Sequence, residues 1–148
     1  MHVLVFLLAC GGPSGDAPPP APAAAPVAAP AHHPAGVEGL SLSLDGTAKW
    51  PMDDHTRSVM AETRSVLEAA TIDAPSDAVA LGKVLQEHGD RLIAGCTMEG
   101  AAHDELHVFL MAWFPEVTAI QSVSDVAAGR ASLGKLRALM AEYDRFFE

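Results

Sequence analysis

Two histidines and a cysteine stand near one another in the sequence, on either side of a glycine. His103 and His107 are four residues apart, so in a helix their side chains project from one face, one turn from each other. Cys96 precedes Gly100, where a turn is expected to bring the end of one helix beside the start of the next. Met98 lies between them. The spacing therefore predicts that a thiol, a thioether and two imidazoles converge.

These donor groups suit a soft metal ion. Thiolate, thioether and imidazole together favour Cu(I), whereas thiolate and imidazole with a carboxylate such as Glu99 or Asp104 favour zinc. His103 is expected in the first turn of its helix, where the helix dipole disfavours imidazolium and favours a nearby thiolate. We therefore interpret this stretch as a metal site, for copper first and zinc second. The candidate ligands are Cys96, Met98, His103 and His107.

A purely structural role is the alternative interpretation of the same residues. A buried cysteine packs as a small hydrophobic residue, and two histidines at this spacing are common by chance in helices. No Glu follows His103 directly, so the zinc-protease motif is not met. A reactive thiol and non-covalent haem held by a histidine and Met98 also stay open. Met52 and His55 would join the site if the first and third helices begin at the same end of the fold.

Composition and motifs exclude several other classes of function. The sequence has no glycine-rich phosphate loop, no Gly-x-Ser-x-Gly elbow and no Cys-x-x-Cys pair. A formal net charge of −10 and a pI near 5.0 make nucleic acid a poor partner. We therefore expect a non-enzymatic protein whose partners are a membrane and, as the alternative to metal binding, a protein of the cell envelope.

The first ten residues are typical of an exported bacterial lipoprotein. A short apolar run ends at Ala9 and Cys10, and it falls far below the about 20 apolar residues that span a bilayer. Residues 1–9 are therefore interpreted as a signal peptide. Leu7-Leu8-Ala9-Cys10 resembles the bacterial lipobox, which implies a lipid on Cys10 and a periplasm-facing location, expected at the outer membrane. Lipidation would leave Cys96 without an internal disulfide partner.

The remaining chain divides into a linker and a folded domain. Residues 10–36 are rich in proline and alanine, which predicts a semi-rigid, lipid-anchored spacer. The folded domain is expected over residues 37–148. It opens with Leu40, Leu42 and Leu44 alternating with serines, which predicts an extended arm packed against helices.

Four segments after this arm repeat apolar residues at the three-and-four spacing of a helix face. Short turns between segments of about 20 residues favour an all-α, up-down-up-down four-helix bundle. Gly100 is expected to end the second helix, and Pro115 to kink or break the third. The helix starts are expected at Asp53 or Asp54, Ser76 or Asp77, Ala101, and Ser122 or Ser124.

The domain also resembles a group of small exported bacterial helical-bundle lipoproteins of uncharacterised function. The resemblance covers about residues 47–148, and it implies the bundle fold and a site without implying a reaction. In that group the position matching His103 can be Asp, whereas the positions matching Cys96 and His107 are kept. The resemblance therefore favours Cys96 and His107 as the main ligands. Its motifs are Lys49-Trp50 with Asp54, Arg57 and Met60, then Cys96-Thr97-Met98, then His103-Asp104-Glu105-Leu106-His107.

Overall fold

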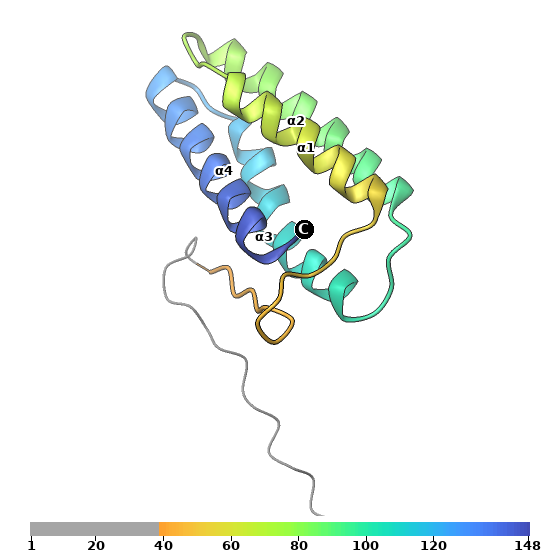
Figure 1. Ribbon diagram of the computed structural model, residues 1–148. Coiled ribbons are helices and arrows are strands. Elements are labelled where there is room, and N and C mark those ends of the chain that lie inside the picture. Colours follow the sequence, from red (N-terminus) through yellow and green to blue (C-terminus); the bar gives the residue numbers. More distant parts are fainter. Residues whose placement is uncertain (1–38) are drawn as a thin grey trace, which may run out of the picture.

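The computed structural model describes residues 39–148, which form four helices. Figure 1 shows the helices packed side by side and alternating in direction, and within residues 39–148 no strand is present. The predicted all-α, up-down-up-down four-helix bundle is confirmed. The predicted signal peptide, Cys10 and the linker lie outside the described residues. The helices are α1 (Asp54–Ala69), α2 (Pro75–Gly95), α3 (Ala101–Ile120) and α4 (Val126–Phe146).

The core is built from the apolar stripes of all four helices. α2 contacts α3, α1 and α4, and α4 also contacts α1 and α3, so α1 and α3 lie diagonally across the bundle. Phe109 of α3 is fully buried, and its ring packs against Trp113, Tyr143 and Phe147. Burial of one such side chain stabilises the fold by about 1.5–3 kcal/mol. The bundle is therefore held mainly by aliphatic and aromatic packing.

Acidic side chains cap two of the helices. The Asp53 carboxylate accepts from Thr56 N at 2.7 Å at the start of α1, as predicted. Asp125 accepts from Ala128 N at 2.8 Å at the start of α4, so the prediction of a serine cap there was wrong. Aspartate caps a helix as well as serine does, and Asp125 is the residue directly before the first turn of α4.

The N-cap of α2 lies two to three residues before the predicted cap. Ala74 is the N-cap and Pro75 is the first helical residue, where its missing N–H costs nothing. Asp77 lies in the first turn and its carboxylate accepts from Asp73 N and Ala74 N at 3.0 and 2.8 Å. Asp77 thus stabilises the turn from inside the helix, whereas Ser76 contributes no cap.

The prediction that Gly100 ends the second helix was wrong. α2 ends at Gly95, and Thr97 leaves the helix to donate its N–H and hydroxyl to the Asp53 carboxylate at 2.9 and 2.8 Å. Burial raises the pKa of Asp53, but hydrogen bonds from Thr56 and Thr97 outweigh it and hold the pKa well below its ordinary value. Gly100 is instead the N-cap of α3, with φ of +73° that favours glycine.

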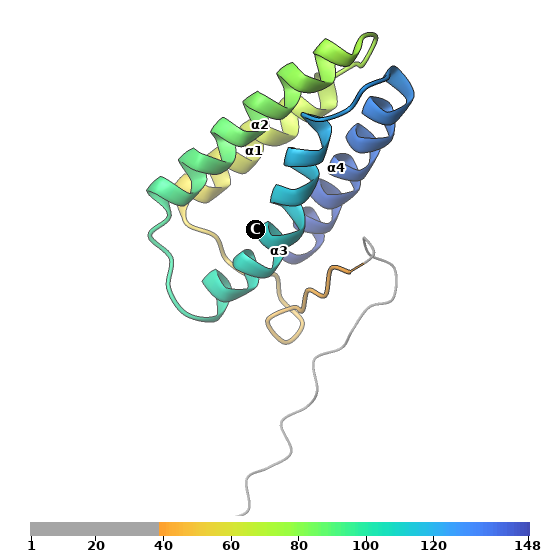
Figure 2. The same cartoon turned by 180° about the vertical axis from the view of Figure 1, so that it is seen from behind.

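Pro115 does not end α3, which continues to Ile120. The proline ring deprives the Met111 carbonyl of its helical hydrogen bond and pushes against that turn. Figure 2 shows α3 changing direction along its length, with its first half running apart from α2. A bent but continuous helix is the result, because apolar residues on both sides of the proline are buried in the same core.

The predicted arm packs on the bundle without forming a strand. Leu42 is buried, and Ser43 donates its N–H and its hydroxyl to the Glu105 carboxylate on α3. Trp50 Nε1 donates to Ser43 O at 2.7 Å, and Trp50 N donates to Phe146 O at 2.8 Å. The arm thus ties the start of α3 to the end of α4. No helix among the described residues has the length and apolar character needed to cross a membrane.

Candidate functional site

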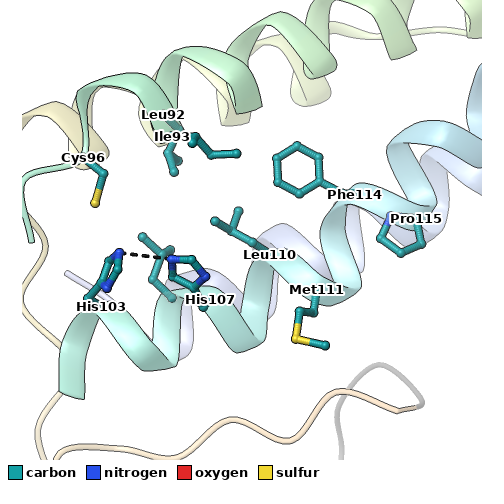
Figure 3. Close-up of a pocket in the computed structure, with 10 residues that line it drawn as sticks. Leu92, Ile93, Cys96, His103, His107, Leu110, Met111, Phe114 and Pro115 are labelled. Carbon is teal, nitrogen blue, oxygen red and sulfur yellow. Dashed lines mark hydrogen bonds between the residues drawn. The ribbon is translucent and has the colours of Figure 1, made fainter. Parts of the chain in front are cut away.

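A pocket opens between the end of α2 and the first half of α3. It has a volume of about 440 Å³, and most of the side chains around it are apolar. Figure 3 shows Cys96, His103 and His107 at one end and Phe114 and Pro115 at the other. No Asp, Glu, Lys or Arg lines it. The lining residues are Leu92, Ile93, Cys96, His103, Leu106, His107, Leu110, Met111, Phe114 and Pro115.

The two predicted histidines form a pair at this end of the pocket. Their Nε2 atoms lie 3.1 Å apart, and the ring centroids are 4.4 Å apart in an edge-to-face arrangement. At this distance one imidazole donates its Nε2–H to the other. His103 is half-buried in the first turn of α3 and His107 is exposed one turn later. The predicted sharing of one helix face is therefore confirmed.

Cys96 faces the histidine pair from the opposite helix. It is the residue directly after α2, it is half-buried, and its thiol is free. In Figure 3 its sulfur points across the pocket toward His103. The structure thus brings the Cys96 thiol at the end of α2 and the two imidazoles of α3 to the same pocket, as the sequence predicted.

These three groups do not form a finished metal site. Among residues 39–148, no three His, Cys, Asp or Glu side chains stand close enough together to hold one ion as they are placed. The preformed part is the imidazole pair alone. A third ligand would require the Cys96 side chain to move toward the pair, or a group from outside the pocket.

Met98 is the predicted ligand that the structure places elsewhere. Its sulfur accepts a hydrogen bond from Asp53 N at 3.3 Å, and its side chain packs against the core outside the pocket. The cause is the path of residues 96–99, which run toward the start of α1 after leaving α2. Met98 therefore stabilises the junction between α1 and the α2–α3 connection.

Met52 and His55 do not join the site either. Met52 is buried in the core, and His55 Nε2 lies 2.8 Å from Arg91 O on the α1 side of α2. The His55 ring occupies the space that a side chain at Gly95 would need. α2 thus separates His55 from the pocket.

His88 has a structural role away from the pocket. Its Nδ1 lies 2.9 Å from Thr63 Oγ1, and that hydroxyl donates its only proton to Val59 O. Nδ1 must therefore be the donor to Thr63. Burial, and then the charge of Arg91, lower the pKa of His88.

Sequence reasoning missed the apolar part of the pocket and Met111 in particular. Met111 continues the four-residue spacing of His103 and His107, so the signal was present in the sequence. Its side chain is 78% exposed, and Ile93 on the opposite rim is 58% exposed. Apolar spacing places Ile93 beside the inward stripe of its helix, and it does not show that the side chain stays exposed at the pocket.

Comparison of the chain with protein-family models, with curated proteins and with solved structures yields no match. The resemblance to exported helical-bundle lipoproteins therefore stays a prediction, and the arguments about function rest on the pocket itself.

Proposed function

We propose that this chain is a lipid-anchored protein of the bacterial cell envelope whose bundle binds a soft metal ion for storage, delivery or sensing. His103 and His107 are the anchoring ligands, and Cys96 closes on the ion from the end of α2. Copper is the first choice and zinc the second.

One observation carries the proposal: the Nε2 atoms of His103 and His107 lie 3.1 Å apart. Metal–imidazole bonds of about 2.0–2.1 Å at roughly tetrahedral angles place two nitrogens about 3.0–3.4 Å apart. An ion that displaces the shared proton can therefore bind both imidazoles with little movement of α3. Because both rings stand on one rigid helix, this chelate requires no ordering of a loop.

The donor set supports a soft ion over a hard one. No carboxylate lines the pocket, and carboxylate or carbonyl oxygens are the ligands that Mg²⁺ and Ca²⁺ require. Imidazole and thiolate suit both copper and zinc, whereas three donors among apolar side chains suit the low coordination numbers of Cu(I) better than the four ligands of a structural zinc site.

Metal titration of matched variants tests this function. The chain with Cys10→Ser should bind one Cu(I) ion in competition with a chromogenic chelator. His103→Ala with His107→Ala should weaken binding by about 100-fold or more, and Cys96→Ala by about 10- to 100-fold. The matched control is His55→Ala, which removes an imidazole outside the pocket. Binding of Cu(I) and Zn(II) that is equally strong in the double histidine variant would refute the proposal.

The proposed membrane anchor has a separate test. The wild-type chain should fractionate with bacterial membranes and carry a lipid on Cys10, whereas Cys10→Ser should leave the membrane fraction. An unmodified Cys10 in the membrane-bound protein would contradict the lipid anchor without bearing on the metal site.

The pocket between α2 and α3 also supports a second candidate function. In this alternative the chain is a non-catalytic interaction module, and its Cys/His cluster is purely structural. The supporting observation is the exposure of Ile93 and Met111 on the two rims of the pocket, since exposed apolar patches often mark interaction sites. The metal titration separates the two functions. A metal site should lose affinity for Cu(I) in the histidine variants, whereas a structural cluster binds no ion in any variant.

A further inference from the structure

The α2–α3 pocket is much larger than a metal ion requires. Its volume is about 440 Å³, whereas an apolar cavity of about 150 Å³ is enough to bind benzene. Cys96, His103 and His107 lie at one end of the pocket (Figure 3). Metal–ligand bonds of about 2.0–2.3 Å keep an ion at that end. Most of the pocket therefore has no role in the proposed metal site.

The rest of the pocket has an apolar wall that the bundle holds in place. The Phe114 ring lies at the end away from the histidines, and it packs against Gly89 of α2 in the space that a side chain there would need. The ring is therefore held against α2 at the end of the pocket. Such a preformed apolar wall is typical of small-molecule sites. Three leucines of the wall belong to the buried core: Leu92, Leu106 and Leu110.

The rim of the pocket carries two exposed apolar side chains, Ile93 and Met111. Only four large apolar side chains are exposed in the described part of the chain, and these are two of them. An apolar molecule in the pocket would remove part of their surface from water, which is favourable. A lining of ten residues has the size of a small-molecule site. A stable protein interface takes about 20–30 residues a side.

The polar end of the pocket determines which small molecules fit. No Asp, Glu, Lys or Arg lines it, so a charged ligand meets no permanent opposite charge. The formal net charge of −10 disfavours an anion in addition. A neutral imidazole has one donor and one acceptor nitrogen, and a hydroxyl group likewise both donates and accepts. The histidine end therefore suits an uncharged hydroxyl.

We infer that this pocket binds a small, uncharged and mainly apolar molecule that carries one hydroxyl group. The hydroxyl lies at the pair formed by His103 and His107, and the apolar body lies against Leu110 and Phe114. The inference goes beyond the proposed metal site and does not rest on it, because the chain provides both ends of the pocket without an ion.

Three matched probes test this inference on the metal-free chain. The chain carries Cys10→Ser and is kept reduced with a chelator at about pH 8, where an ordinary imidazole is neutral. Para-ethylphenol has both parts of the ligand, ethylbenzene lacks the hydroxyl, and para-ethylbenzoate carries a charged carboxylate instead. Para-ethylphenol should bind with a Kd of about 1 mM or lower. It should bind about 3- to 10-fold more tightly than either of the other probes.

An NMR titration measures each Kd and locates the probe. The largest shifts should fall on the methyl groups of Ile93 and Met111 and on the ring protons of the histidine pair. His103→Ala with His107→Ala should remove the preference for para-ethylphenol over ethylbenzene. The matched control His55→Ala removes an imidazole outside the pocket and should keep that preference.

Substitutions at the apolar end should weaken the binding of para-ethylphenol and ethylbenzene alike. Phe114→Ala removes the end wall and should weaken both by about 3- to 10-fold. Ile93→Ala removes an exposed side chain at the rim, so it leaves the fold intact and should weaken both by about threefold. The Ile93 variant keeps the test valid even if loss of the Phe114 ring disturbs the bundle.

Three results would overturn the inference. Failure of para-ethylphenol to shift the signals of the pocket residues would show that the pocket takes no such molecule. Equal affinity for para-ethylphenol and ethylbenzene would show that the histidine end does not recognise a hydroxyl. Tighter binding of para-ethylbenzoate would show that the site prefers an anion. The affinity of the chain for Cu(I) is measured separately, so none of these results bears on the metal site.

Discussion

The two ends of the α2–α3 pair differ in how closely the helices approach. At one end Gly82 lets α3 pack directly on α2, because Ile120 and Gln121 occupy the space of its missing side chain. At the other end α3 bends near Pro115 and the pocket with Cys96 and the histidine pair lies between the helices. The same two helices thus form a tightly packed contact and an open groove.

This difference separates residues that hold the fold from residues that are free to do chemistry. Ile120 at the packed end is fully buried, whereas Ile93 at the open end is 58% exposed. The hydrogen bond between His103 and His107 joins the two imidazoles to each other and not to the backbone. The exposed and half-buried side chains of the open end are therefore where we look for function.

Substitution of the two isoleucines should give the largest difference between the packed end and the open end. Ile120→Ala should lower the free energy of unfolding by about 2–5 kcal/mol, because it leaves a cavity in a fully packed core. Ile93→Ala should change it by about 0.5 kcal/mol or less, since the side chain stays largely in water. Urea unfolding followed by circular dichroism measures both. Equal losses would show that the groove is part of the core.

His88 lies at a second packed contact, between α1 and α2, where its ring bonds to Thr63. Burial lowers the pKa of His88, so the folded state prefers the neutral ring more than the unfolded state does. Its contribution to stability is therefore present above about pH 6.5 and is lost as the pH falls through the lowered pKa. The free energy of unfolding should decline on acidification below that pH, by a smaller amount than the loss in Ile120→Ala.

The control for this effect is a substitution of the titrating ring itself. His88→Gln should flatten the decline. A decline that persists in full in His88→Gln would show that other groups set the acid sensitivity.

Apolar spacing predicted the helices and the bundle because each stripe, such as Leu81, Leu85 and Leu92 on α2, is buried as a unit. Helix ends were less predictable. Gly95 and Gly100 are both suitable terminators, and the hydrogen bonds from Thr97 to Asp53 decide in favour of Gly95. Those bonds join residues far apart in the sequence, so no local pattern reveals them.

The part of the candidate site that lies on a helix could be predicted, and the part that lies in a connection could not. His103 and His107 lie on one helix, where spacing fixes which side chains share a face. Met98 lies in the α2–α3 connection, whose path is set by contacts with α1, and it was therefore assigned to the site incorrectly. Met111 was missed although it lies on the same helix and continues the four-residue spacing of the two histidines.

X-ray absorption at the copper edge tests most directly whether the open end is a metal site. The chain with Cys10→Ser, loaded with one equivalent of Cu(I), should show imidazole scattering together with a sulfur shell. The imidazole signal should disappear in His103→Ala with His107→Ala and persist in His55→Ala. A spectrum without imidazole or sulfur, or one that the double histidine substitution leaves unchanged, would contradict the proposed site.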